Sequence, residues 1–369
     1  MPHGAAERMA TTTGPRHPFL ASKRTWLQAA TLVAMAVFIA WRVDLQEAWD
    51  VFTSIGPGYA VLGVALLIAS NAVHARKWQQ LLRGLGRVNF GHSFSVFWAS
   101  MATNTVIPLR AGDVLRVQVM SQRTGLPRPG IVGSLFTERL LDGVAFIVLV
   151  AVGLLLMGRE NYVNFWLLAL FALFVMLVVA TILAARATPG SELEKTRWLR
   201  PLPERLRHRA AAFLPHVIDG IRPLGRASSA LEVTGWALLS WGLEAGAFIA
   251  WGEAFGLDVG VGALVLVMVA VNAAGALTVL PANLGIFELT AVGILRAAGV
   301  DSPEATAYAV GTHLLIIATI VLIGLGTFIY LRLSPADIFY IRRPEEVASP
   351  GRHASPEPRT PASPSHDRR

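Results

Sequence analysis

The sequence contains no cysteine, and this absence excludes disulfide bonds, cysteine-based metal sites and cysteine nucleophiles. Charged residues are also scarce, because Asp, Glu, Lys and Arg make up only 15% of the chain while hydrophobic residues make up 54%. The apolar residues gather in blocks that approach the roughly 20 residues a helix needs to cross a bilayer. We therefore predict an all-α polytopic membrane protein.

Lysine is nearly missing, so the formal net charge of +8 comes almost wholly from arginine. The arginines lie in particular loops between hydrophobic blocks, which is typical of membrane orientation and of contact with anionic lipids, and not of nucleic-acid binding. The sequence has no Gly-x4-Gly-Lys-Ser/Thr loop, no histidines at metal-ligand spacing and no Ser–His–Asp constellation. We expect no nucleic-acid partner, no metal and no cofactor.

The charges of the loops predict about six full transmembrane helices plus two re-entrant helical hairpins, or seven or eight spans if a hairpin is counted as crossing. The predicted full spans are 26–41, 59–82, 131–157, 163–185, 232–251 and 305–331. Together they are predicted to form one transmembrane domain, 23–333. Both termini are expected in the cytoplasm, with residues 1–22 and 334–369 disordered.

The first hairpin is predicted from a conflict with the positive-inside rule. Residues 92–107 are apolar but short for a crossing, and several arginines follow Pro108 and Gly112. A full crossing would place these arginines outside, whereas a re-entrant hairpin with its tip at 108–112 keeps them inside. Broken helices of this kind are tolerated where they are buried in protein or line a cavity.

The hairpin pattern recurs about 174 residues later, where Pro108-x3-Gly112 returns as Pro281-x3-Gly285. The half-repeats are 58–157 and 232–332. The loop at Arg128 is basic and its counterpart at Asp301 is acidic, so the halves are predicted to be inverted. Inverted repeats with broken helices are an architecture of transporters, which place the substrate site at the repeat interface.

The two half-repeats are joined through a long connection, and residues 186–231 of it are read as a cytoplasmic linker. Apolar residues recur at helical spacing over 206–221, opposite three arginines. That segment is interpreted as an amphipathic helix lying on the inner membrane surface, with an ordinary soluble helix as the alternative.

Charged residues within apolar segments mark the candidate site, because charge inside a bilayer is costly. Arg110, Asp113 and Arg116 fall at or just after the first tip. Asp113 and Arg116 are three residues apart and are predicted to pair on one helical face. The planar guanidinium groups suit a phosphate. The alternative is a purely structural Asp–Arg pair, with Arg110 reaching the inner interface.

Glu138 and Asp142 share one face of the third predicted span, with Arg139 beside them. Two unpaired carboxylates on one stripe would repel each other, so Arg139, Arg116 or Arg110 should lie nearby. A functional network and a structural clamp both remain open.

Further polar residues are predicted near the second tip or inside other spans. Asn283 and Glu288 flank that tip, Glu244 would meet an arginine or hold a proton, and His313 is either a satisfied interior histidine or a proton relay. The proposed head-group path comprises Asn104, Arg110, Asp113, Arg116, Glu138, Arg139, Asp142, Asn283 and Glu288. Six tryptophans are expected to be interface anchors: Trp78, Trp98, Trp166, Trp198, Trp236 and Trp251.

As a set, these motifs resemble the membrane domain of lysylphosphatidylglycerol synthases and the wider flippase-like family built on it. The resemblance covers about residues 25–332. It is carried by Arg76 and Trp78, Asn104-x3-Pro108-x3-Gly112-Asp113-x2-Arg116, Gly125, Glu138-Arg139-x2-Asp142, and Leu280-Pro281-x3-Gly285-x2-Glu288 with Gly299 beyond.

The resemblance implies movement of a polar lipid between leaflets. The lipid would be an anionic phospholipid such as an aminoacylated phosphatidylglycerol, a polyprenyl-phosphate glycan or a hopanoid-type lipid. The synthases add a soluble aminoacyltransferase domain, but only about 36 residues follow Leu333 here, too few for such a domain. We therefore expect a stand-alone member that is not an enzyme.

The leading hypothesis is a protein that translocates or handles a phosphate-bearing lipid, by facilitated or proton-coupled movement. One alternative is a membrane-embedded lipid-modifying transferase, of the lysylphosphatidylglycerol synthase or glycosyltransferase-associated kind, with Asp113, Glu138 or Asp142 as its base. Another is a scaffold for a separate lipid-synthesis enzyme.

Overall fold

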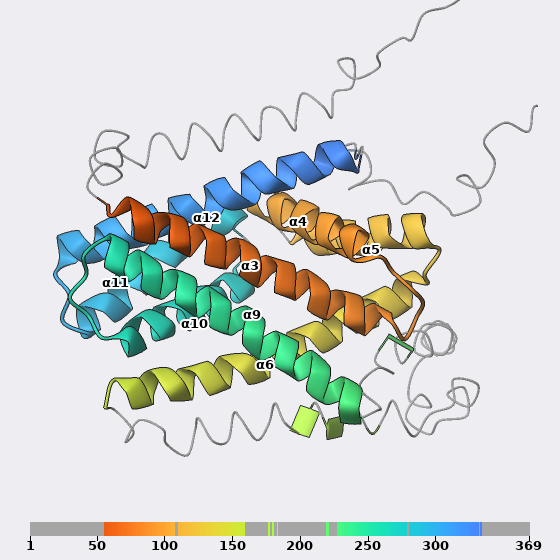
Figure 1. Ribbon diagram of the computed structural model, residues 1–369, viewed down its shortest axis with the longest axis horizontal. Coiled ribbons are helices and arrows are strands. Elements are labelled where there is room, and N and C mark those ends of the chain that lie inside the picture. The colour runs from red at the N-terminus through yellow and green to blue at the C-terminus, as the bar shows by residue number, and fades with distance from the viewer. Residues whose placement is uncertain are drawn as a thin grey trace, which may run out of the picture.

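The computed structural model describes residues 55–107, 110–158, 227–278, 280–331 and 333, together with a few positions between 176 and 220. Within these residues every regular element is a helix (Figure 1), as predicted for a polytopic helical membrane protein. The predicted spans 26–41 and 163–185, the amphipathic linker helix and both terminal segments lie wholly or almost wholly outside the described residues.

Four helices are long and apolar enough to cross a membrane within the described part of the chain. They are α3 (Pro57–Leu82), α6 (Arg128–Leu156), α9 (Ala227–Ala254) and α12 (Ser302–Tyr330). Their bounds match four predicted spans to within a few residues. Helices α3, α6 and α12 each carry a proline in the first turn, where the fixed φ of proline suits a helix and its missing N–H would have no partner.

Two helical hairpins separate these long helices. The first consists of α4 (Phe90–Val106) and α5 (Ala111–Thr124), and the second of α10 (Val261–Leu277), the short 3₁₀ turn η6 (Pro281–Asn283) and α11 (Ile286–Ala297). The hairpin helices have between 12 and 17 residues, so each is short for a full crossing. Non-glycine residues at the tips adopt left-handed backbone angles: Arg110, Ala282 and Asn283, with φ between 50° and 57°.

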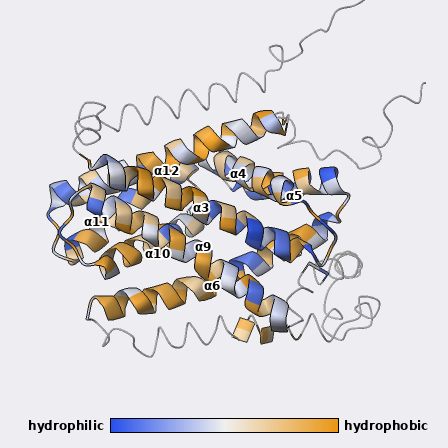
Figure 2. Ribbon diagram, viewed as in Figure 1, coloured by the Kyte–Doolittle hydropathy of each residue, from blue (hydrophilic) through white to orange (hydrophobic). Residues whose placement is uncertain are grey.

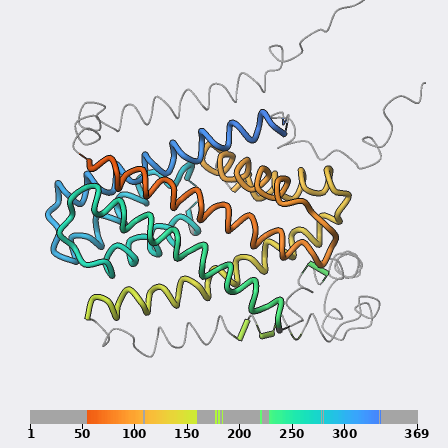
Figure 3. Tube along the Cα trace, in the orientation of Figure 1, coloured from red at the N-terminus to blue at the C-terminus, as the bar shows by residue number. Residues whose placement is uncertain are grey.

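The long helices α3 and α9 form an antiparallel central pair, which Figure 3 shows crossing the middle of the molecule. At one end, the backbone N–H of Gly56 donates to the carbonyl of Ala254 over 2.9 Å. At the other end, Arg83 lies 4.0 Å from Glu232. The beginning of each helix therefore meets the end of the other.

Each hairpin also packs on the last helix of the other half. Helix α4 packs against α12, and α10 packs against α6. Each half has the same order of long helix, hairpin and long helix. This order and the antiparallel pairing agree with the predicted inverted repeat, whereas the side of the membrane that each end faces stays a prediction.

Figure 2 shows hydrophobic residues along much of the long helices, with hydrophilic residues gathered near the end of α3 and around α5. Helix α12 exposes large apolar residues, including Leu322, Leu325 and Ile329, as a lipid-facing surface would. The predicted role of interface anchor is wrong for Trp78, Trp98 and Trp251, which are fully buried. These large rings fill the interior, where the helices cross.

Candidate functional site

A cavity of about 540 Å³ lies between the two hairpin tips and is walled by all four long helices. The turn η6 contacts α4, so the tips belong to one site. The cavity is lined by ten of the residues singled out from the sequence, which are Asn104, Arg110, Asp113, Arg116, Glu138, Arg139, Asp142, Glu244, Asn283 and His313. Segments far apart in the chain thus contribute polar side chains to one cavity, which is also lined by many apolar residues.

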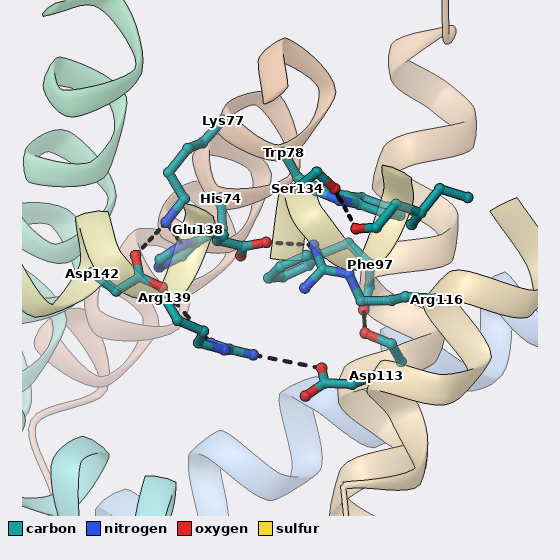
Figure 4. Close-up of polar contacts among 12 residues, drawn as sticks. His74, Lys77, Trp78, Phe97, Asp113, Arg116, Ser134, Glu138, Arg139 and Asp142 are labelled. Atoms are coloured by element: carbon teal, nitrogen blue, oxygen red, sulfur yellow. Dashed lines mark hydrogen bonds and ion pairs between the residues drawn. The ribbon is translucent and has the colours of Figure 1, made fainter. Parts of the chain in front are cut away.

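Arg116 is the most deeply enclosed cation of this chamber. Its Nη2 donates to Oε2 of Glu138 over 2.8 Å, and both side chains are only 2% exposed. The guanidinium lies 4.1 Å from the centre of the Trp78 ring and 5.0 Å from that of Phe97 (Figure 4). Stacking on aromatic faces and one strong hydrogen bond compensate part of the cost of burying this charge.

The predicted pairing of Asp113 with Arg116 is wrong. Asp113 occupies the first turn of α5 and faces the cavity, where Arg139 donates to it over 3.5 Å and Arg110 lies 4.0 Å away. Arg116, one turn later, points instead toward α6 and Glu138. The expectation that one of the arginines lies near the two carboxylates of α6 is met, since Arg116 pairs with Glu138 and Arg139 lies 3.7 Å from Asp142.

The cations that remain accessible are therefore Arg110 and Arg139, whose side chains are 39% and 48% exposed. Both lie near the carboxylate of Asp113, and Arg139 also lies near that of Asp142, all at distances longer than those of a good charged hydrogen bond. An incoming anion could thus bind both guanidinium groups without breaking a strong pair.

Lys77 was missed as a site residue. The sequence places it between Arg76 and Trp78, which suggests a basic end of a span at the cytoplasm. Instead Lys77 is fully buried, where its ammonium contacts Oδ1 of Asp142 and lies 3.1 Å from Nδ1 of His74. The three-residue spacing of His74 and Lys77 on one helical face was the available signal.

Asp142 also accepts a hydrogen bond from Nε1 of Trp241 over 2.9 Å. Lys77, Asp142 and Trp241 thus join α3, α6 and α9, with Asp142 and Trp241 in the cavity wall (Figure 4 shows Lys77 and Asp142). An ion pair satisfied in this way holds three long helices in register.

The second tip carries a different pair. Nδ1 of His313 lies 2.6 Å from Oε1 of Glu288, and Nε2 lies 2.8 Å from the carbonyl oxygen of Ala282. The other carboxylate oxygen of Glu288 accepts from the backbone N–H of Gly285 over 2.8 Å. Glu288 is the third residue of α11, just as Asp113 is the third residue of α5, so each tip has an acid paired with a base on the following long helix.

Two asparagine side chains form hydrogen bonds within the cavity wall. Asn272 donates to Glu244 over 2.9 Å, and Glu244 forms no ion pair with an arginine among the described residues. Asn104 accepts from the backbone N–H of Gly112 over 2.7 Å, which joins α4 to α5. A Cβ at Gly112 would collide with the backbone of α4, so glycine is required for this close approach.

Comparison with known proteins identifies a family that covers most of the chain. The model of the lysylphosphatidylglycerol synthase TM region matches residues 25–324. A glycosyltransferase, AglD of Haloferax volcanii, is 29% identical over 126 residues, which is 32% of this chain and 20% of that protein. The chain thus covers about a fifth of the length of this relative. No solved structure matches the chain.

Proposed function

We propose that this chain, which belongs to the family of the lysylphosphatidylglycerol synthase TM region, moves a polar, phosphate-bearing lipid between the two leaflets of its membrane. The family and the partial likeness to a glycosyltransferase support a membrane protein concerned with lipids. The step from lipid handling to translocation rests on the geometry of the cavity.

The observation that carries the proposal is the pair of exposed arginines in a cavity between two re-entrant tips. Arg110 at the first tip and Arg139 on α6 approach Asp113 and leave much of each side chain open to the cavity. Guanidinium groups bind phosphate through paired N–H donors, and this binding gains strength away from bulk water. A lipid phosphate would enter between them while its acyl chains stay in the bilayer.

The buried residues have a supporting role in this proposal. Arg116 is closed off by Glu138 and two aromatic rings, so it holds α5 against α6 and does not itself grip phosphate. Lys77 and Asp142 hold α3 against α6 in the same way. Asn104 and Asn283 line the path and offer neutral hydrogen-bonding groups to the head group.

The remaining assignments follow from the loop charges and the family. We place the protein in a bacterial inner membrane with both termini in the cytoplasm, so the arginine-bearing tip belongs to the inner half of the path. Candidate lipids are an anionic phospholipid, a polyprenyl-phosphate glycan and a hopanoid-type lipid, and a separate enzyme would supply the lipid.

Reconstitution tests translocation directly. Purified protein is placed in phosphatidylglycerol-containing vesicles with a trace of phosphatidylglycerol that carries a fluorescent NBD group on its head. External dithionite then destroys only the fluorophores that reach the outer leaflet. We expect the wild-type protein to expose the inner pool, and Arg139→Gln to slow this exposure about tenfold or more, because one of two phosphate ligands is lost.

Arg296→Gln is the matched control, since Arg296 is exposed at the end of α11 and does not line the cavity. This variant should behave as the wild type. Wild-type vesicles that lose no more fluorescence than empty ones, or an Arg139→Gln variant as fast as the control, would contradict the proposal. If deletion of the protein from cells removes a lipid species altogether, the transferase alternative is favoured instead.

A further inference from the structure

The contacts of His313 fix how many protons the second tip must hold. The ring is 5% exposed and is stacked on Phe287, with the ring centres 4.1 Å apart. Its two nitrogens face two oxygens, one from Glu288 and one from the carbonyl group of Ala282. A histidine side chain with both nitrogens engaged cannot turn to a new partner without losing one of them.

The carbonyl oxygen of Ala282 can only accept, so Nε2 of His313 must donate to it. Nδ1 then either donates to an ionised Glu288 or accepts from a protonated one. In both cases the pair holds one proton more than a neutral imidazole beside a carboxylate. Both hydrogen bonds therefore require this additional proton.

When the additional proton leaves, only one of the two hydrogen bonds can remain. A neutral imidazole has a single N–H, and a hydrogen bond to a carboxylate is about twice as strong as one to a neutral carbonyl. The N–H therefore stays with Glu288, and the bond to Ala282 is lost.

The bond to Ala282 holds a strained piece of backbone. Ala282 and Asn283 have φ values of 50° and 57°, a left-handed conformation that strains residues with a Cβ. The turn that contains them contacts α4 and lines the cavity. Loss of this bond frees the tip to relax and move away from the first hairpin.

We propose that Glu288 and His313 form a proton-binding site that holds the second tip in place, and that release of the proton loosens this tip. The first tip lacks this property, because its equivalent pair, Asp113 with Arg139, contains an arginine that stays charged at all physiological pH values. One end of the cavity is thus sensitive to pH while the other is permanently charged.

Charged groups from the surrounding helices do not replace this pair. Besides His313, the charged or titratable residues of the cavity wall are His74 on α3, Arg110 at the first tip, Asp113 and Arg116 on α5, Glu138, Arg139 and Asp142 on α6, and Glu244 on α9. Among the described residues, Glu288 and His313 form an ion pair with each other and with no other residue. The proton site does not depend on lipid translocation and is tested without it.

The test measures exposure of the tip in the full-length protein. A single Leu280→Cys change is labelled with bimane, since the native chain has no cysteine and Leu280 is 51% exposed beside the tip. Quenching of the label by acrylamide is followed from about pH 5 to about pH 9, on both sides of physiological pH. We expect the quenching constant to rise about twofold or more with pH.

Glu288→Gln is the decisive variant. A glutamine can donate to Nδ1 of a neutral His313 while its oxygen still accepts from Gly285, so both bonds to the ring survive and quenching should stay low at every pH. His313→Ala should give high quenching at every pH. A Val114→Cys label, on the first hairpin and 56% exposed, should show no rise.

Constant quenching at Leu280 in the otherwise native protein would overturn the inference. A rise that persists in Glu288→Gln would overturn it as well, because the pH response would then come from another group. Neither result bears on lipid translocation by the wild-type protein, so failure of the two proposals can be told apart.

Discussion

Replacing Arg116 by leucine should destabilise the protein strongly, because Glu138 would be left as a buried charge without its partner. The pair is 2.8 Å long and both side chains are 2% exposed. Removing one partner of such a buried pair costs about 3–5 kcal/mol. The loss of stacking on Trp78 adds about 1–2 kcal/mol.

Replacing both partners should cost less than replacing either one. In the double variant Arg116→Leu/Glu138→Leu no charge remains to be desolvated, and apolar residues in place of a buried ion pair are often neutral or stabilising. We expect the coupling energy between the two positions to be about 3 kcal/mol. The aromatic contact of Arg116 is lost in the single and the double variant alike, so it cancels from the cycle.

The measurement is unfolding of the purified protein from mild detergent micelles by increasing mole fractions of dodecyl sulfate, followed by tryptophan fluorescence. The four proteins of the cycle give four free energies of unfolding. If the losses in free energy of unfolding caused by the two single changes simply added in the double variant, the coupling energy would be zero and the reasoning would be refuted. An Arg116→Leu variant as stable as the wild type would also refute it, because the carboxylate of Glu138 would then be solvated by water in the folded protein.

Two further predictions concern the topology and the packing of the hairpins. Single cysteines introduced at Arg128 and Asp301 should react with a membrane-impermeant maleimide from opposite sides of the membrane, since the halves are antiparallel, and labelling from the same side would contradict the inverted repeat. Gly112→Ala should lower the free energy of unfolding by about 1–3 kcal/mol, because its Cβ meets the backbone of α4. Gly235→Ala, with open space around its Cβ, should raise it by about 0.5–1 kcal/mol.

The fold was largely predictable because its signals are local. Span lengths, loop charges and the recurrence of Pro108-x3-Gly112 each depend on short stretches of sequence, and they located the long helices and both hairpins.

The partners within the site were harder to predict because they depend on which face each helix turns inward. Arg116 and Asp113 lie three residues apart, a spacing that permits pairing, yet α5 presents them to different neighbours. Lys77 follows an arginine and precedes a tryptophan, and its burial depends on the packing of α3 against α6 and α9. The spacing of His74 and Lys77 places them on one face but does not show that this face is turned inward.

Each hairpin packs on the last long helix of the other half, and this packing limits how the molecule can move. Helix α4 is packed on α12 and α10 on α6, while α3 and α9 remain paired at the centre. Rocking one sequence half against the other would shear both of these contacts at once. The rigid bodies that can move with least loss of packing therefore combine elements of both halves. One consists of the first hairpin with α12, the other of the second hairpin with α6, and the α3–α9 pair is the axis between them.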